Sequence, residues 1–268
     1  MKQPICYLLF LAVLPLVCYS AKPKNGFVKV RVAQWNIGQL SMGKKGKTVF
    51  TRQKRNEKAI AYSRLINDVR ADIFCMNEFA PYFSLKDSLR EDSADLTRNT
   101  LLSMYEDCRY GTRYGANCNC IAVASGVIEN FKTVDYKVKK QHRYYSMGEI
   151  HMNGVKIKIV STHLEVPPEK AERKAQIQEL LKLLSNEPYV ILCADFNIAD
   201  TSEYDAFKDH GFSMANHNFL GDLITFPYKS GGVCIDNIMC KGFNVMGVDV
   251  YKTDLSDHYV IAVDLIMK

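Results

Sequence analysis

The sequence of 268 residues predicts a mixed α and β fold, and three observations support this prediction. Short apolar runs recur along the chain and end in polar residues, which is typical of strands. Two longer segments carry apolar residues at helical spacing. The chain is 47% hydrophobic and 24% charged, which suits a sizeable core. Because no repeat, low-complexity tract or linker divides the chain, we expect one domain over residues 21–268.

The first 20 residues are typical of a secretory signal peptide. Met1-Lys2 gives a positive start, Ile5 to Val17 is apolar, and Cys18-Tyr19-Ser20 places small residues before a cleavage point. A membrane span is the alternative, but the apolar stretch is shorter than the ~20 residues that a bilayer needs. Lipoprotein anchoring at Cys18 is less favoured, because Pro15-Leu16-Val17 lacks the small residue usual before a lipid-modified cysteine. We therefore expect an exported protein, periplasmic or secreted.

Apolar runs predict four strands, and polar residues follow each of them. In chain order the runs are Val28 to Val32, Asp72 to Met76, Val155 to Val160, and Val190 to Ala194. The last run is almost unbroken, as expected of a strand buried on both faces. The polar residues that follow are Gln34-Trp35-Asn36, Asn77-Glu78, Thr162-His163-Leu164 and Asp195-Phe196-Asn197, and a fifth cluster is Ser256-Asp257-His258.

A strand that runs into a polar cluster delivers its last side chains to one rim of a sheet. Any single cluster is more simply a turn or a helix cap. Five clusters of acids, amides and imidazoles predict convergence on one pocket, with the composition of a hydrolytic metal site. Two segments predict helices: Arg55 to Val69, with Ile60, Leu65 and Ile66, and Pro168 to Leu184, with Ile177, Leu180, Leu181 and Leu184 on one face.

The ordered motifs resemble the endonuclease/exonuclease/phosphatase superfamily, which includes deoxyribonucleases, abasic-site endonucleases, neutral sphingomyelinases and inositol polyphosphate 5-phosphatases. They are Trp35-Asn36, Asn77-Glu78, Thr162-His163-Leu164, Asp195-Phe196-Asn197, Ile235-Asp236-Asn237-Ile238 and Ser256-Asp257-His258. The resemblance runs from about Val28 to the C-terminus. It implies an α+β fold: a four-layer αββα sandwich of two mainly antiparallel sheets flanked by helices, as in deoxyribonucleases. It also implies a metal-dependent hydrolase of phosphoester bonds.

The resemblance implies a magnesium site at Asn36, Glu78 and Asp257. Mg²⁺ prefers hard oxygen ligands, and Mn²⁺ is expected to substitute for it. A cation of this kind offsets the negative charge that develops when a phosphate ester is hydrolysed. Cysteine is not needed in such a site. The seven cysteines beyond the signal peptide are an odd number, so disulfides are possible but at least one thiol is unpaired within a monomer.

Five residues are candidates for the chemistry itself. We expect Asp195 to orient and deprotonate the attacking water. In an extended segment Asn197 would point the same way and donate its amide protons to a phosphate oxygen. Asp236 is expected to favour the imidazolium form of His258, although Asp-His pairs also tie down surface loops. The resemblance implies that His163 contacts the phosphate or the leaving group.

Substrate contacts are predicted less directly. Arg143 could supply a guanidinium that binds a phosphate through two N–H groups. Asn119 stands where relatives often place a substrate-contacting amide. The alternative for both is an ordinary surface residue. Two basic groups could attract a polyanion if they border the pocket, and otherwise form solvated faces. Many relatives carry Arg or Lys where this chain has Gly231-Gly232-Val233-Cys234, which weakens inference about the substrate loop. The basic groups are Lys44, Lys45, Lys47, Arg52, Lys54, Arg55 and Lys58, and Lys137, Lys139, Lys140, His142 and Arg143.

Together these features predict an exported, Mg²⁺-dependent phosphodiesterase that acts on nucleic acid as a monomer without an obligate protein partner. A sphingomyelinase-like lipid phosphodiesterase is an alternative that Thr162-His163-Leu164 favours, and a small-molecule or inositol phosphate phosphatase is another. A catalytically inactive binding module is a third, but it would be expected to have lost one of the four key acids and imidazoles. All four are present: Glu78, Asp195, Asp236 and His258.

Overall fold

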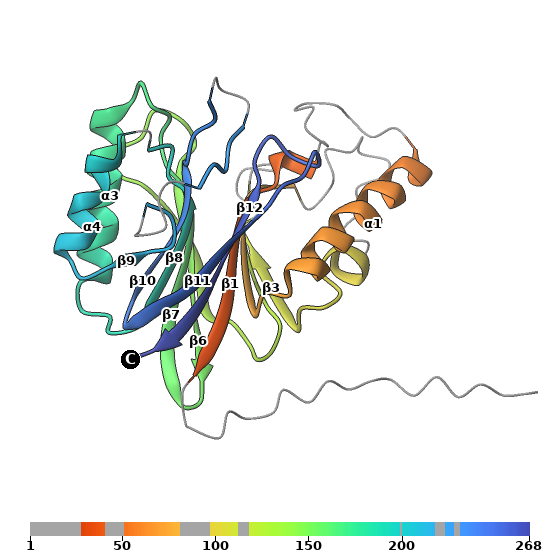
Figure 1. The fold of residues 1–268 in the computed structure, drawn as a ribbon, viewed down its shortest axis with the longest axis horizontal. Helices are drawn as coiled ribbons and strands as arrows, with labels where there is room; N and C mark the ends of the chain where they lie inside the picture. The colour runs from red at the N-terminus through yellow and green to blue at the C-terminus, as the bar shows by residue number, and fades with distance from the viewer. Residues whose placement is uncertain are drawn as a thin grey trace, which may run out of the picture.

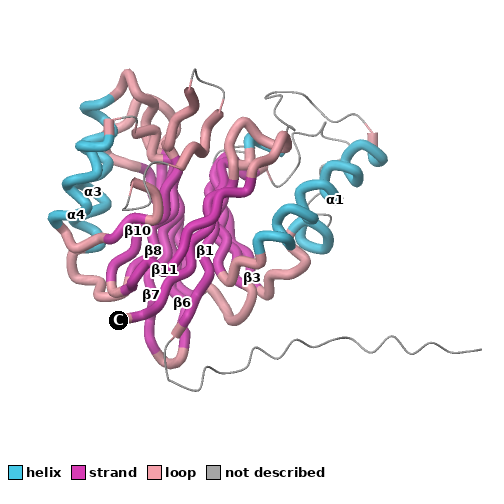
Figure 2. The backbone as a smooth tube through the Cα atoms, in the orientation of Figure 1, coloured by secondary structure: helices cyan, strands magenta, loops and turns pink. Residues whose placement is uncertain are grey.

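Two six-stranded sheets form the centre of the molecule, as the computed structural model shows (Figures 1 and 2). The structure describes residues 28–40, 51–80, 97–111, 118–198, 200–217, 223–227 and 231–268. The signal peptide predicted at residues 1–20 lies outside these ranges and stays a prediction, as does the domain boundary at residue 21. Within the described ranges, no helix is long and apolar enough to span a membrane.

The first sheet is built from both ends of the chain. Its strands, in spatial order, are β11 (Phe243–Tyr251), β12 (Val260–Met267), β1 (Lys29–Asn36), β2 (Ile73–Phe79), β4 (Cys118–Val123) and β3 (Asp107–Tyr110). β1 and β2 are parallel, and the other neighbours are antiparallel. Asn36 lies directly beside Asn77 in this register, so the polar clusters that follow both strands meet at one edge.

The second sheet uses the middle of the chain. Its strands, in spatial order, are β5 (Glu129–Asp135), β6 (Tyr144–Met152), β7 (Val155–His163), β8 (Val190–Asp195), β10 (Asp236–Lys241) and β9 (Ser213–Met214). β7 and β8 are parallel, and the other pairs are antiparallel. The register places Asp195 between His163 on one side and Asp236 on the other. Three candidate residues therefore form one row.

Helices cover the outer face of each sheet, which gives the four layers that the resemblance implied. α1 (Arg52–Val69) packs on the first sheet, and α3 (Lys170–Leu184) packs on the second together with η4 (Thr201–Tyr204) and α4 (Asp205–Asp209) (Figure 1). Two short turns of helix, η1 (Gly38–Leu40) and η3 (Thr97–Leu101), complete the described helices. The space between the sheets is filled by apolar side chains such as Val32, Cys75, Ile159 and Cys193.

The two predicted helices exist, but one of them was assigned the wrong apolar residue. α3 buries Ile177, Leu180, Leu181 and Leu184, as predicted. α1 begins at Arg52, where the Thr51 hydroxyl caps the backbone N–H of Lys54. Ile60 is 46% exposed, because the buried face consists of Ala59, Tyr62, Ile66 and Val69. No disulfide joins the seven described cysteines, and Cys75 and Cys193 are core residues, as predicted.

Candidate active site

A cavity of about 350 Å³ opens at the edge where β1, β2, β7 and β8 end. It brings together eight predicted site residues from six separate segments of the chain. The lining residues are Asn36, Glu78, Gln141, Arg143, His163, Val166, Pro167, Asp195, Asn197, Phe226, Ile235, Asp257 and His258. Of the predicted residues, Asp236 and Asn119 do not line the cavity.

Asp236 lies behind the cavity wall, where it holds His258. The Nδ1 atom of His258 is 2.8 Å from Oδ2 of Asp236, and Nε2 of His258 is 3.8 Å from Oδ2 of Asp195. Both side chains of the Asp236–His258 pair are almost completely buried. The indole of Trp35 donates to the His258 carbonyl over 3.0 Å, and the Phe226 ring lies 4.8 Å from the imidazole. The imidazole is therefore fixed between two carboxylates.

Charge around His258 favours its protonated form. Burial alone would lower the pKa of His258, but the charge and hydrogen bond of Asp236, with the charges of Asp195 and Asp257, outweigh it and raise the pKa to about 9. The pKa of Asp195 is also raised, to about 6, by its burial and by the charge of Asp236. At neutral pH the cavity floor thus holds an ionised Asp195 beside an imidazolium.

Donors surround the Asp195 carboxylate. Its Oδ2 atom accepts from Nδ2 of Asn36 over 2.9 Å and is 3.3 Å from Nε2 of His163. Its Oδ1 atom accepts from the backbone N–H of Asn197 over 3.0 Å. The carboxylate is therefore oriented by groups from both sheets, while it still lines the cavity.

Asn197 does not lie in an extended segment, so the prediction that it parallels Asp195 was wrong. β8 ends at Asp195, and Asn197 has a left-handed backbone with φ of 54°. The cause is local: the Asp195 side chain accepts from the backbone two residues on, which bends the chain in the manner of an Asx turn. The Asn197 amide donates to the Leu164 carbonyl over 3.0 Å and still lines the cavity.

Three oxygen-bearing residues of the cavity lining suit a divalent cation. Asn36, Glu78 and Asp257 line the cavity together, and Nδ2 of Asn36 is 3.3 Å from Oε1 of Glu78. The backbone of Glu78 is left-handed, with φ of 49°, at a register shift between β2 and β4, so Glu78 departs from the regular alternation of the strand. Two carboxylates and an amide are hard donors of the kind that Mg²⁺ takes.

Gly38 allows the Asp257 segment to lie close to this wall. Its φ is +59°, and a Cβ at this position would lie 3.0 Å from Oγ of Ser256 and 3.4 Å from Oδ1 of Asp257. That hydroxyl donates in turn to the Asn36 carbonyl over 2.7 Å. The close approach of the Ser256 and Asp257 side chains to the Gly38 backbone therefore depends on the absence of a side chain at Gly38.

A second group of possible metal ligands consists of Asp195, Asp236 and His258, whose ligand atoms lie within 4.8 Å of one another. His258 is a poor ligand here, because Nδ1 donates to Asp236 and the raised pKa keeps Nε2 protonated. A cation and an imidazolium would also repel each other at this spacing. The Asn36, Glu78 and Asp257 set fits a metal ion better.

Arg143 reaches the cavity, whereas Asn119 does not. Arg143 is buried, its Nη2 donates to Oε1 of Gln141 over 3.0 Å, and its Nε lies 3.6 Å from Oε2 of Glu165. Asn119 instead donates its side-chain amide to the Tyr144 carbonyl and accepts from Nδ2 of Asn77 over 2.9 Å. Asn119 belongs to the support of the site.

Sequence reasoning missed part of the cavity and its buried support. Three lining residues were not singled out, namely Gln141, Val166 and Pro167. Glu165 is fully buried and accepts from the backbone N–H groups of Lys140 and Gln141 over 2.8 and 2.9 Å, so it holds the loop that carries Arg143. The sequence feature that could have identified Glu165 is its position directly after the Thr162-His163-Leu164 motif.

The basic groups receive limited support as a polyanion surface. Lys44, Lys45 and Lys47 lie outside the described residues. In the second group, Lys139 pairs with Asp135 at 3.3 Å, and Lys140 pairs with Glu169 at 3.0 Å and Glu172 at 3.5 Å. Paired lysines attract a distant polyanion less than free ones, which favours the alternative of a solvated face for this group.

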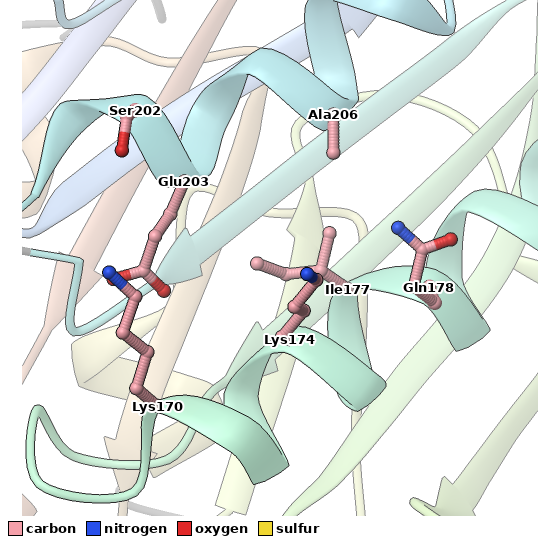
Figure 3. A pocket seen from close by; sticks show the side chains of 7 residues that line it. All are labelled: Lys170, Lys174, Ile177, Gln178, Ser202, Glu203 and Ala206. Atoms are coloured by element: carbon pink, nitrogen blue, oxygen red, sulfur yellow. The ribbon is translucent and has the colours of Figure 1, made fainter.

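A smaller cavity of about 220 Å³ lies on the outer face, between α3 and the η4–α4 segment (Figure 3). Lys170, Lys174, Gln178, Ser202 and Glu203 line it over a floor that includes Ile177 and Ala206. Lys170 is paired with Asp200 at 2.9 Å. None of the predicted site residues lines this cavity.

Comparison with protein families agrees with the order of the motifs. A model described as the endonuclease/exonuclease/phosphatase family matches residues 33–258. No curated protein matches the chain.

Solved structures share the fold at low sequence identity. A humanized TDP2 of D. rerio, carrying 14 mutations, is 15% identical, with a TM-score of 0.69 over 88% of this chain and 98% of that one. An endonuclease/exonuclease/phosphatase from Beutenbergia cavernae is 17% identical, with a TM-score of 0.68 over 89% and 72%. The human Nocturnin catalytic domain with bound sulfate is 20% identical, with a TM-score of 0.65 over 90% and 97%.

Proposed function

Because the chain belongs to the endonuclease/exonuclease/phosphatase family and is a metal-dependent phosphoester hydrolase, we propose that it is an exported Mg²⁺-dependent phosphodiesterase acting on nucleic acid. The observation that carries the proposal is the buried Asp236–His258 pair, which holds the imidazole beside Asp195 at the cavity. It places a base and an imidazolium side by side. Hydrolysis of a phosphodiester uses both, the base for the attacking water and the imidazolium for the charge on the phosphate. The oxygen-rich wall of Asn36, Glu78 and Asp257 faces the same cavity.

Asp195 is the residue best placed to take a proton from the attacking water. Its pKa of about 6 leaves it ionised at neutral pH and more basic than an ordinary aspartate. Asn36 and the Asn197 backbone fix its two oxygens, so the orientation of the carboxylate is set before substrate arrives. Such orientation avoids reorganisation during the reaction.

His258 supplies positive charge where the phosphate becomes more negative. Its Nδ1–H is occupied by Asp236, which leaves Nε2–H for a phosphate oxygen. Arg143, on the cavity wall, adds a second cation, and His163 stands beside Asp195 within reach of the phosphate or the leaving oxygen. Asn197, with one amide proton on Leu164, keeps a second for a phosphate oxygen.

A magnesium ion would be held by Glu78, Asp257 and the side chain of Asn36. When bound, it supplies charge that offsets the developing negative charge of the phosphate. Without a cation, carboxylates dominate the cavity, since Glu78, Asp195 and Asp257 line it and Asp236 lies beneath. An anionic substrate would then be repelled, which supports a metal requirement for binding as well as for turnover.

Two further observations support the substrate and the export. The structure of D. rerio TDP2 in complex with a single-strand DNA product shares this fold, at 16% identity and a TM-score of 0.66. The positive and apolar pattern of residues 1–20 supports export. Sequencing the N-terminus of the protein recovered outside the cytoplasm tests export, and an uncleaved N-terminus on cytoplasmic protein contradicts it.

The test of function is a hydrolysis panel with Mg²⁺ or Mn²⁺ present. It compares plasmid DNA, RNA, sphingomyelin, inositol polyphosphates and bis(p-nitrophenyl) phosphate, with Asp195→Asn as the matched inactive control. We expect cleavage of a nucleic acid and of the small diester, and loss of both in excess EDTA. Turnover of sphingomyelin or an inositol phosphate alone would refute the nucleic acid assignment, and full turnover in EDTA would refute the metal requirement.

A further inference from the structure

Asn77 is a buried amide at the seam between the two sheets. It is 0% exposed and lies in β2, beside Asn36 of β1. The two neighbouring β2 residues that share its face, Ile73 and Cys75, are part of the apolar core between the sheets. A polar side chain in this position is costly unless all its groups are paired.

The structure pairs all four hydrogen-bonding positions of the Asn77 side chain. Its Oδ1 atom accepts from Nε2 of Gln34 over 2.7 Å and from the backbone N–H of Asp195 over 2.8 Å. Its Nδ2 atom donates to Oδ1 of Asn119 over 2.9 Å and to Oγ of Ser161 over 3.4 Å. One side chain therefore connects β1 and β4 of the first sheet with β7 and β8 of the second.

Backbone groups fix the direction of this network. The Asp195 N–H can only donate, so Oδ1 of Asn77 must face it. At the other end the Tyr144 carbonyl can only accept, so Nδ2 of Asn119 must face it, over 3.0 Å. The orientations of both amides follow from these two ends, and neither can be flipped without leaving buried groups unpaired.

Asn77 is also the residue before Glu78. Asn77 is therefore joined by a peptide bond to Glu78, the proposed metal ligand. Its side chain also accepts from the backbone N–H of Asp195, the proposed base. We propose that Asn77 is a positioning residue that sets the distance between Glu78 and Asp195 across the seam of the two sheets. It does not line the cavity, so it acts through these two residues and not on the substrate. The inference rests on the proposed function.

Kinetics of three variants test the proposal. Asn77→Ala removes every bond, and Ser161→Ala removes only the longest bond. Asn77→Asp keeps an acceptor for Asp195 and Gln34 and, as the protonated acid that burial favours, one donor for Oδ1 of Asn119. With bis(p-nitrophenyl) phosphate, Asn77→Ala should lose about 10- to 100-fold in kcat, with KM changed by less than about threefold, because misplacement of reacting groups affects turnover more than binding. The kcat of Asn77→Asp should be at least about fivefold higher than that of Asn77→Ala, and the kcat of Ser161→Ala should resemble that of wild type.

A destabilising variant outside the site separates positioning from loss of stability. Leu184→Ala creates a cavity at the end of α3, where Leu184 is 0% exposed, and should therefore destabilise the fold away from the site. Assayed below its melting temperature, it should keep wild-type kcat. The proposal is overturned if Asn77→Ala keeps wild-type kcat, or if Leu184→Ala of matched melting temperature loses as much kcat as Asn77→Ala.

Hydrogen exchange tests the anchoring without relying on activity. The exchange rate of the Asp195 amide, measured by NMR in metal-free protein, should rise at least about tenfold in Asn77→Ala and stay near wild type in Asn77→Asp. An unchanged Asp195 rate in Asn77→Ala overturns the inference. If wild-type protein hydrolyses nothing in the substrate panel, the proposed function fails, whereas the exchange result still decides whether Asn77 anchors Asp195.

Discussion

Replacing Asp236 with Asn should remove the charge that keeps His258 protonated, without changing the shape of the side chain. The wild-type pKa of about 9, compared with the ordinary 6.5, corresponds to about 3 kcal/mol of preference for the imidazolium. Burial alone favours the neutral ring. The pKa of His258 in Asp236→Asn should therefore fall from about 9 toward 6.5, although the charges of Asp195 and Asp257 remain.

The consequence for charge at pH 7.5 is large. With a pKa of about 9, about 97% of His258 is protonated, whereas with a pKa of 6.5 the fraction is about 9%. Turnover at this pH should thus fall at least about tenfold from the lost imidazolium alone, and further because the ring loses its orienting partner.

NMR titration of the imidazole carbons in metal-free protein measures this directly, and the spectrum of His258→Gln assigns the signal among the six histidines. Stability gives a second measurement. A raised folded-state pKa stabilises the fold fully below pH 6.5, and this contribution is lost as the pH rises through 9. The stability deficit of Asp236→Asn should therefore be largest near pH 6. A His258 signal that still titrates near 9 in the variant would refute the reasoning.

Four other variants test the remaining assignments. Asp195→Asn should lower kcat at least about 100-fold. The raised pKa of Asp195 stabilises the fold below pH 3.8, and this contribution is lost as the pH rises through 6, so the variant's free energy of unfolding in urea should exceed that of wild type by up to about 3 kcal/mol at pH 8 and by almost nothing at pH 4. A lower free energy of unfolding at pH 8 would contradict this. Glu78→Gln should weaken Mn²⁺ binding in calorimetry while the melting temperature stays near wild type; equal affinity would exclude Glu78 as a ligand. Gly38→Ala should lower the melting temperature and weaken Mn²⁺ binding, because a Cβ would press on Ser256 in a left-handed backbone. Arg143→Lys should raise KM more than it lowers kcat, because lysine lacks the planar guanidinium that Gln141 orients. An unchanged KM would exclude Arg143 from substrate binding.

Local patterns were sufficient to predict the strands and the candidate residues that follow them. Asn36, His163 and Asp195 are the last residues of β1, β7 and β8, and they lie at the cavity because a strand fixes where its last side chain goes. The same patterns failed where a side chain bends its own backbone: Asp195 turns the chain at Asn197, so the extended geometry assumed for the pair does not exist.

The supporting network could not be predicted for a different reason. The bonds of Asn77 to Asp195 and Asn119 span 118 and 42 residues, so their partners are determined by the packing of sheets and not by sequence spacing. Glu165 likewise gains its importance from a loop 24 and 25 residues away. Ile60 was misplaced because one apolar residue within a helix does not reveal which face is buried.

The order of strands has a consequence for synthesis of the protein. The second sheet is one continuous segment, whereas the first needs β1 and β2 from the beginning of the chain and β11 and β12 from its end. Asp257 and His258 directly precede β12, which pairs with β1 from Lys29 to Gln34. The proposed catalytic set is therefore incomplete until β12 has left the ribosome and closed the first sheet. Nascent chains shorter than this have no competent site, whatever part of the second sheet has already formed.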